Sequence, residues 1–145
     1  MALIPLEQEV ELVKSYLAIE QVRFGKRLTI SFCIETDANP LIPPLIVQPL
    51  VENAVKHGVY PKRAGGTIQI SITKTERETL IVVSDDGVGM TPDKIQSLLN
   101  DKKAEEVGIG IQNINKRLQK YYGDGLNIQS NINQGTIITV RIPNQ

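Results

Sequence analysis

The segment LVENAVKHG, residues 50–58, places an acid, an amide, an ammonium group and the only histidine of the chain in a mostly apolar run. Pro43 and Pro44 precede it, where a helix can start because proline costs little in a first turn. Gly58 ends it with the residue type most typical of a helix C-terminal cap. The segment therefore predicts a helix over residues 44–57, closed by Gly58.

This predicted helix has a polar and an apolar side. At about 100° per residue, side chains three and four positions apart lie on the same side. The polar side carries Glu52, Asn53, Lys56 and His57. The apolar side carries Leu50, Val51, Ala54 and Val55. An amide oxygen, a cation and an imidazole at a helix end suit a metal ion with phosphate oxygens. A solvated polar face, with a histidine stabilised by the helix dipole, explains this segment alone equally well.

Hydrophobic periodicity divides the rest of the chain into helices and strands. Helical spacing predicts helices over residues 6–24, 91–99 and 111–122, with Thr91 as the N-cap of the second and Pro92 in its first turn. Alternating or short apolar runs predict strands over residues 28–35, 67–74, 79–85, 127–132 and 136–142. Pairs of consecutive strands between helices indicate an α/β two-layer sandwich, a mixed sheet of about five strands covered by helices.

Composition narrows the class of protein. The chain has 145 residues, 41% of them hydrophobic, which suffices for one domain with one core. Its 16 basic and 16 acidic residues cancel, so it lacks the charge excess that nucleic acid or an anionic membrane selects. The richest apolar stretch is short and broken by prolines, and we expect neither a membrane span nor a signal peptide within the chain.

A second polar cluster, SDDGVGM at residues 84–90, follows an apolar predicted strand. An ionised carboxylate only accepts hydrogen bonds, and so it suits the exocyclic amine of adenine. Gly87 and Gly89 allow the backbone to approach a flat base because they lack a Cβ atom. Alone, such an Asp-x-Gly-x-Gly string is equally typical of an ordinary turn.

A third segment, GIGIQNI at residues 108–114, places two glycines directly before a predicted helix. Free backbone N–H groups and the positive end of the helix dipole favour phosphate at such a position. The segment alone is only moderately specific for that ligand.

In this order, the segments resemble the ATP-binding catalytic domain of sensor histidine kinases, in the superfamily that also contains DNA gyrase, the ninety-kilodalton heat-shock chaperone and MutL. ENAVKHG is similar to the N box, DDGVG to the first glycine box, GIGI to the second, and GTIITVRIP to the closing strand. More narrowly, EVELVKSYLAIEQVRFGKRL, PPLIVQPLVENAVKHG and GIGIQNINKRL resemble the LytS/YehU type of bacterial sensor kinase. The resemblance covers nearly the whole chain and implies the Bergerat-type ATP-binding fold.

The resemblance also implies a role for each matched polar residue. Asn53 would ligate Mg²⁺, and the ion would bridge the phosphates of ATP. Lys56 and His57 would contact phosphate oxygens. Asp85 would accept a hydrogen bond from the adenine amine, with Thr136 assisting through a shared water.

Glycines and a loop complete the implied site. Gly87 and Gly89 would border the base, while Gly108 and Gly110 would present backbone amides to the phosphates. The charged segment of residues 90–107 would be a lid over the nucleotide. Arg117, farther along the last predicted helix, would contact phosphate or form a surface pair.

Pro49 separates kinase from ATPase within the superfamily. The gyrase, chaperone and MutL branches have a glutamate four residues before the metal-binding Asn, where it orients the attacking water. Pro49 offers no base at that position, which disfavours rapid hydrolysis and favours transfer to another acceptor. Glu52 and His57 are the candidate catalytic residues. Glu52 would act as a base or polarise the acceptor histidine, although a helix-face ion pair is the alternative.

The resemblance further implies that the chain is a fragment, because its only histidine lies inside the nucleotide site. Residues 1–27 would be the connecting helix from a phosphoacceptor stalk, and residues 28–145 the catalytic domain. The implied cofactors are ATP and Mg²⁺, and the implied partners are upstream dimerisation helices and a response regulator, without nucleic acid. The domain would be the cytoplasmic part of a membrane-anchored homodimer that binds ATP without labelling itself. The alternative function is a nucleotide-dependent interaction module without transferase activity.

Overall fold

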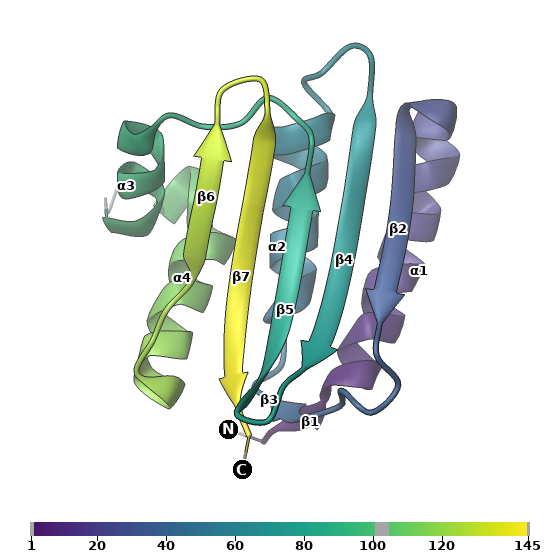
Figure 1. Ribbon diagram of the computed structural model, residues 1–145. Coiled ribbons are helices and arrows are strands. Elements are labelled where there is room, and N and C mark those ends of the chain that lie inside the picture. The colour runs from purple at the N-terminus through teal and green to yellow at the C-terminus, as the bar shows by residue number, and fades with distance from the viewer. Residues whose placement is uncertain (1, 101–104, 145) are drawn as a thin grey trace.

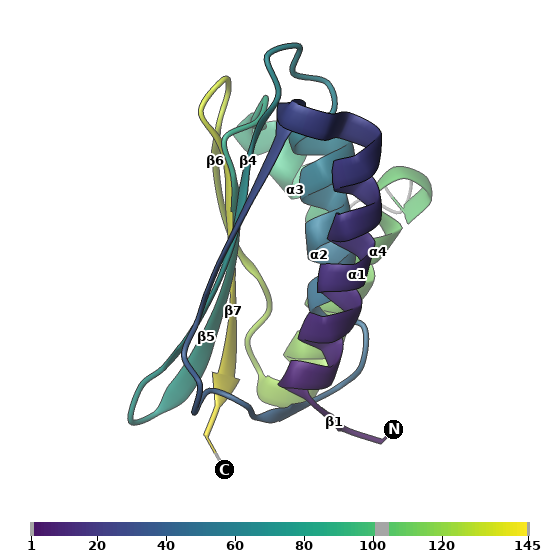
Figure 2. The same cartoon turned by 90° about the vertical axis from the view of Figure 1, so that its right-hand side faces the viewer.

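The computed structural model describes residues 2–100 and 105–144. A five-stranded sheet with the strand order β2-β4-β5-β7-β6 forms one layer. Its strands are β2 (Leu28–Ile34), β4 (Gly66–Lys74), β5 (Glu78–Asp85), β6 (Asn127–Asn131) and β7 (Gly135–Pro143). The second layer consists of α1 (Leu6–Phe24), α2 (Val47–Asn53), α3 (Pro92–Asn100) and α4 (Glu105–Tyr122). All of these helices lie on one face of the sheet (Figures 1 and 2), and the predicted two-layer sandwich is confirmed.

The sheet is mixed, as predicted. β2 pairs parallel with β4, whereas the pairs β4–β5, β5–β7 and β6–β7 are antiparallel. Alternate residues of each strand point to opposite faces, and the residues facing the helices are buried. In the central strands these are Ile68, Ile70, Ile72, Ile81, Val83, Ile138, Val140 and Ile142. Because β5 and β7 are antiparallel neighbours, the end of β5 and the start of β7 meet at the upper edge in Figure 1.

Helix α1 matches its predicted bounds and belongs to the same core as the sheet. Its apolar stripe, which consists of Leu6, Val10, Val13 and Leu17, is buried. The helix ends before Gly25, whose φ of 60° favours glycine. Burial of this stripe fixes α1 beside α2 and β2.

Helix α2 begins at Val47, three residues later than the sequence predicts. The prediction relied on Pro44, but the first-turn amides are satisfied by a side chain from α1. Glu9 Oε1 accepts hydrogen bonds from Val47 N at 2.8 Å and from Gln48 N at 3.3 Å. Leu45 lies just before the helix with a φ of 59°, outside the helical range. A fully buried acid that is distant in sequence therefore sets where this helix starts.

The prediction that Gly58 caps this helix is wrong. The helix continues after Asn53 as a π-helical segment, η2 (Ala54–Val59), and Tyr60 N donates to Val55 O at 2.8 Å. Gly58 lies inside η2 and against β5, where a Cβ atom would stand 2.6 Å from Asp85 Oδ1. The glycine is thus required for close packing, and the sequence pattern for a cap does not distinguish these two uses.

Helix α4 begins at Glu105, six residues before the predicted start. The two glycines that were expected to precede it lie within it. Gly110 faces α2, and a Cβ atom there would stand 3.1 Å from Pro49 Cβ. Close contact between the two helices therefore accounts for a glycine that the sequence analysis assigned to a loop.

Smaller elements connect the layers. A two-stranded sheet pairs β1 (Ile4–Pro5) with β3 (Leu41–Ile42), and the short 3-10 helix η1 (Gly25–Arg27) joins α1 to β2. Two-residue strands carry no periodic pattern, which is why the sequence analysis did not find them. At α3, the predicted cap is confirmed, because Lys94 N donates to Thr91 Oγ1 at 3.2 Å.

Candidate functional site

Four of the predicted site residues, Asn53, His57, Asp85 and Thr136, come together where η2 meets the ends of β5 and β7. Asp85 and Thr136 are direct partners in the β5–β7 register. Asn53 and His57, one turn apart, line a small cavity between the helix and α3, together with Gly89, Met90, Lys94 and Leu98. Residues that are far apart in the sequence therefore share one edge of the sheet, at the top of Figure 1.

Asp85 is the best-defined acceptor in this region. Its Oδ1 accepts a hydrogen bond from Gly87 N at 2.9 Å, which orients the carboxyl group. Burial raises the pKa of Asp85 from 3.8 to about 6, and Asp86 also raises it, while hydrogen bonds from Gly87 and Thr136 lower it. At pH 7 the group is therefore ionised and only accepts hydrogen bonds.

The first glycine box packs against protein backbone on both sides. A Cβ atom at Gly87 would stand 2.1 Å from Gly58 O, and one at Gly89 would stand 1.9 Å from Asn131 O. Gly89 has a φ of 70°, and Val88 N donates to Gly58 O at 3.1 Å. The turn thus holds η2 and the β6–β7 hairpin together, and Gly89 also lines the cavity beside Asn53.

Two lysine side chains lie near His57, one turn from Asn53. The pKa of His57 is lowered, first by burial and then by the nearby charges of Lys94 and Lys56. Both ammonium groups therefore disfavour protonation of the imidazole. Lys56 itself borders a groove against α1, with Phe24 and Tyr60. Lys94, which the sequence analysis did not single out, lies on the cavity side.

Two other predicted residues lie elsewhere. Glu52 Oε1 accepts a hydrogen bond from Gln48 Nε2 at 3.2 Å, one turn earlier on α2. Arg117 donates to Pro44 O at 2.5 Å and to Leu45 O at 3.1 Å, at the start of α2 and therefore at the opposite end from Asn53. Arg117 thus fastens α4 to the segment before α2, in place of a phosphate contact.

The second glycine box is placed differently from the prediction. Gly108 is the fourth residue of α4, and Gly110 lies further inside the helix. Only the first four N–H groups of a helix lack an intrahelical acceptor, so the amide of Gly110 is not available to a ligand in this arrangement. The predicted lid, residues 90–107, includes α3, whereas its residues 101–104 lie outside the described residues.

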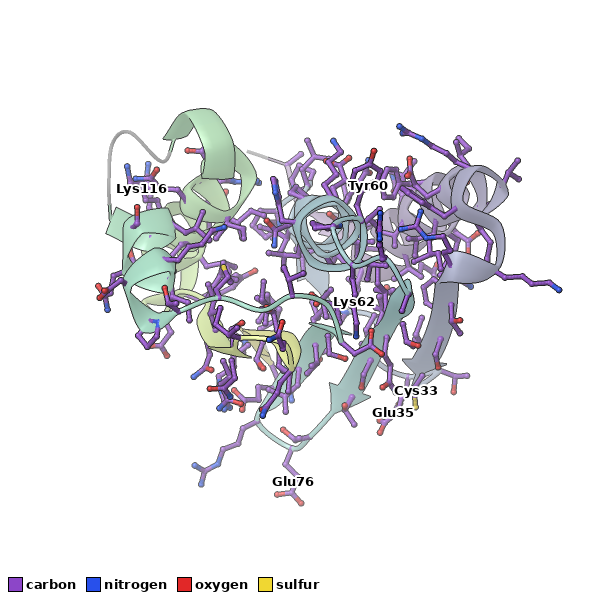
Figure 3. The ribbon with its side chains drawn as sticks, turned by 90° about the horizontal axis from the view of Figure 1, so that it is seen from above. Cys33, Glu35, Tyr60, Lys62, Glu76 and Lys116 are labelled. Atoms are coloured by element: carbon purple, nitrogen blue, oxygen red, sulfur yellow. The ribbon has the colours of Figure 1, made fainter. Side chains whose placement is uncertain are left out.

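Sequence reasoning missed Ser130 and the role of Asp86. Ser130 Oγ lies 2.8 Å from Thr136 Oγ1 and accepts a hydrogen bond from Met90 N at 2.8 Å. Asp86 Oδ1 accepts from Thr67 N at 2.7 Å, and its backbone oxygen accepts from Lys62 Nζ at 2.7 Å. Lys62 is labelled in Figure 3, which looks down on this edge. A lone polar residue on a strand gives no sequence signal, which explains why Ser130 was missed.

Among residues 2–100 and 105–144, no group of three His, Cys, Asp or Glu side chains gathers that could hold a metal ion by itself. Within the same residues, no helix is both long and apolar enough to cross a membrane.

Comparison with known proteins relates the chain to ATP-binding domains. Residues 39–145 match the family model described as histidine kinase-, DNA gyrase B- and HSP90-like ATPase. The chain is 38% identical over 143 residues to the sensor histidine kinase YpdA of Escherichia coli (strain K12), covering 98% of this chain. It is 35% identical over 148 residues to the sensor protein LytS of Bacillus anthracis, covering 97% of this chain. The chain spans 25% of the length of each of these relatives.

A solved structure has the same fold. The catalytic domain of the histidine kinase ThkA, in a nucleotide-free form, superposes with a TM-score of 0.77. The superposition covers 99% of this chain and 96% of that domain, at 14% sequence identity. At this identity the likeness establishes the architecture, including the mixed sheet with helices on one face.

Proposed function

Because the chain belongs to the family of histidine kinase-, DNA gyrase B- and HSP90-like ATPases, as an ATP-binding domain of the LytS type, we propose that it catalyses phosphoryl transfer in a two-component sensor histidine kinase. The γ-phosphoryl group of ATP passes to a histidine outside these residues. Catalysis of phosphoryl transfer consists mainly of positioning the reactants and stabilising charge.

The packing of Gly58 against Asp85 is the observation that carries this proposal. Gly58 directly follows His57 and lies five residues after Asn53, so the contact brings the half-buried carboxyl group of Asp85 beside the helix that carries both residues. An acceptor-only group and a cationic cluster on adjoining elements match the two ends of a nucleotide, its base and its phosphates. Asp85 accepts from the 6-amino group of adenine, and Thr136 lies beside it.

Lys94 and Lys56 supply positive charge near His57, whose lowered pKa leaves its imidazole neutral and able to donate one N–H to a phosphate oxygen. Two ammonium groups close together in a chain of zero net charge favour an anionic ligand. Lys94 on α3 adds to the Lys56 and His57 pair implied by the resemblance. Charge-assisted hydrogen bonds from such groups to phosphate oxygens are among the stronger ones in proteins.

Mg²⁺ fits this site through Asn53. The ion usually takes one or two protein oxygen ligands and completes its shell with phosphate oxygens and waters. The amide oxygen of Asn53, in the cavity with His57 and Lys94, is a suitable protein ligand. Bound there, the ion would neutralise charge on the phosphates, while Asn53 orients it.

The lid assignment finds support in the size of the cavity. The space lined by Asn53, His57, Met90 and Lys94 is about 30 Å³, whereas sites for small molecules are typically about 300–1,000 Å³. α3 must therefore move away from η2 before a triphosphate enters. Residues 90–107 act as the lid, with α3 as its first part.

Pro49 favours transfer over hydrolysis. It lies within α2 and faces Gly110 of α4, so this position is used for helix packing and carries no base. Glu52 remains the candidate that acts on the acceptor histidine, although its hydrogen bond to Gln48 favours a role on the helix face. A nucleotide-dependent interaction module is the second candidate, supported by the lid and by the exposed Ile19 and Val22 on α1.

The remaining parts of the proposal concern the whole protein. Residues 1–27 join the catalytic domain, residues 28–145, to an upstream stalk that carries the acceptor histidine and dimerises. The full protein is a membrane-anchored homodimer with this domain on the cytoplasmic side, and a response regulator receives the phosphoryl group.

Calorimetric titration with ATP and Mg²⁺ tests the binding site. The chain should bind, whereas Asn53→Ala and Asp85→Ala should lose affinity by about tenfold or more. Asn127→Ala and Asp124→Ala, exposed residues elsewhere, serve as matched controls and should bind like the parent. A folded parent that does not bind ATP would refute the proposal.

A phosphotransfer assay separates the two candidate functions. With radiolabelled ATP, a kinase domain labels a longer protein that contains the stalk histidine and leaves the isolated chain unlabelled. An interaction module binds ATP and labels neither.

A further inference from the structure

Ser130 occupies the centre of a hydrogen-bond network beside the proposed base pocket. Its hydroxyl oxygen lies 2.8 Å from Thr136 Oγ1, 2.8 Å from Met90 N and 2.9 Å from Gly135 O. The side chain is half-buried on β6, and Ser130 is the register partner of Thr136. Thr136 in turn pairs with Asp85, so Ser130, Thr136 and Asp85 lie in one row across three strands.

The proton count at Ser130 fixes the direction of these hydrogen bonds. A serine hydroxyl has one proton to donate and two lone pairs to accept. Met90 N–H is a donor and Gly135 O is an acceptor, so Ser130 accepts from the first and donates to the second. All three contacts are then hydrogen bonds only if Thr136 Oγ1 donates to Ser130 Oγ.

This arrangement determines what Thr136 offers to a ligand. Since its hydroxyl proton points to Ser130, only the lone pairs of Oγ1 remain for the pocket. Asp85, ionised at pH 7, also only accepts. Adenine presents a donor at its 6-amino group, whereas a 6-oxo purine presents an acceptor there. The row therefore favours adenine over a 6-oxo base.

We propose that Ser130 is a positioning residue for base selection, which keeps the Thr136 hydroxyl in its accepting orientation beside Asp85. The proposal rests on the proposed ATP-binding function and extends it to a residue of β6. Ser130 also fastens Met90, the residue that follows the glycine box and lines the cavity beside Asn53, to the sheet. The base pocket and the start of the lid thus share one hydroxyl group.

The test compares ATP with inosine triphosphate, which carries a 6-oxo group and an N1–H in place of the 6-amino group. Dissociation constants for both nucleotides with Mg²⁺ are measured for the parent, Ser130→Ala and Ser130→Thr. Ser71→Ala, a half-buried strand serine on β4, is the matched control. Ser130→Ala frees the Thr136 proton to donate, so the preference for ATP over inosine triphosphate should fall by about three- to tenfold. Ser130→Thr keeps a hydroxyl group at this position and should keep the parental preference for ATP.

A double-mutant cycle keeps the test independent of general destabilisation. Thr136→Val removes the hydroxyl at similar shape and should lower the same preference. Adding Ser130→Ala to Thr136→Val should then change the preference no further, because the two residues act through one proton. A purely structural Ser130 would weaken both nucleotides equally.

The outcomes distinguish this inference from the proposed function. If the folded parent binds neither nucleotide, the proposed function fails, and this inference fails with it. If the parent prefers ATP and Ser130→Ala keeps the parental preference, ATP binding stands and the role of Ser130 is overturned. If Thr136→Val loses the preference but Ser130→Ala does not, Thr136 reads the base without Ser130, and the inference is again overturned.

Discussion

Gly58 and Asp85 are in such close contact that a Cβ atom on the glycine would stand 2.6 Å from Asp85 Oδ1, 2.7 Å from its Cγ and 2.9 Å from its Oδ2. All three of the nearest atoms belong to one side chain. The contact joins the helix that carries Asn53 to the strand that carries Asp85, the proposed base acceptor. It makes the geometry of the two ends of the site interdependent.

Replacing Gly58 by alanine should therefore disturb Asp85. We expect Gly58→Ala to lower the free energy of unfolding by about 1–3 kcal/mol through overpacking and to weaken ATP binding by about tenfold. Chemical denaturation and calorimetric titration measure the two effects.

A second variant identifies the cause. Without the clash, alanine in a helix is favoured over glycine by about 0.5–1 kcal/mol, so Gly58→Ala should be neutral or stabilising when Asp85 is already alanine. An equal destabilisation in both backgrounds would show that Asp85 is not the residue that the new methyl group meets.

ATP binding should weaken in acid because Asp85 must be ionised to accept the adenine amine. With a pKa of about 6, affinity should fall below pH 6 by up to about tenfold per pH unit. Calorimetric titrations at several pH values measure how ATP affinity depends on pH. Asp85→Asn has no ionisable group at this position, so its pH dependence reports the contribution of ATP itself. Parallel slopes in parent and variant would contradict this assignment.

The pH dependence of stability in the nucleotide-free chain should be opposite to that of ATP affinity. The contribution of Asp85 to the free energy of unfolding should fall as the pH rises. The pKa of Asp85 is higher in the fold than its ordinary value of 3.8, so the folded state binds more protons between these values. Its contribution to stability is therefore greatest below pH 3.8 and is lost as the pH rises through about 6. Asp85→Asn should remove this component from a series of denaturation curves.

His57 gives a direct probe of the cationic cluster because it is the only histidine in the chain. Lys94 lowers its pKa, so Lys94→Ala should raise that pKa, as seen by proton NMR titration of the single imidazole. The same variant should weaken ATP binding by about three- to tenfold. Lys74→Ala, at the far end of β4, should leave the imidazole titration unchanged. An unchanged His57 pKa in Lys94→Ala would place the lysine outside the site.

Glu9 should contribute strongly to stability, because its buried carboxyl group satisfies the Val47 and Gln48 amides at the start of α2. We expect Glu9→Ala to lower the free energy of unfolding by about 2–4 kcal/mol, since it leaves one buried and one partly buried donor without an acceptor. Glu9→Gln keeps an acceptor oxygen and should cost less. Glu11→Ala, which breaks only an exposed ion pair with Lys14, should stay within about 0.5 kcal/mol of the parent.

Periodic segments could be predicted from the sequence, and contacts between distant segments could not. The alternation of β4 and the apolar stripe of α1 are local patterns, and both elements lie where they were expected. The start of α2 depends on Glu9, which precedes Val47 by 38 residues. No local pattern contains such a contact.

The same distinction applies to the site. Asn53, His57 and Asp85 stand in recognisable motifs, and the structure brings them to one edge of the sheet. Ser130 and Lys94 belong to no motif and enter through the pairing of β6 with β7 and the position of α3. Glycine was the least predictable residue type, because a glycine before a turn and a glycine under a neighbouring helix look alike in sequence. Gly110 proved to pack against the neighbouring helix α2, and Gly58 against Asp85 of β5.

The direction of α1 determines how far a segment that precedes this helix must reach to contact the candidate site. The helix starts at the edge of the sheet opposite Asn53 and Asp85 and runs toward them (Figure 1). Its 19 residues span about 28 Å at 1.5 Å per residue. In the proposed kinase, a phosphoacceptor joined ahead of Leu6 would have to fold back along that length to reach the phosphates bound to the same chain. If the proposed function holds, the length of the segment ahead of α1 would therefore limit transfer within one chain as much as the chemistry of the acceptor does.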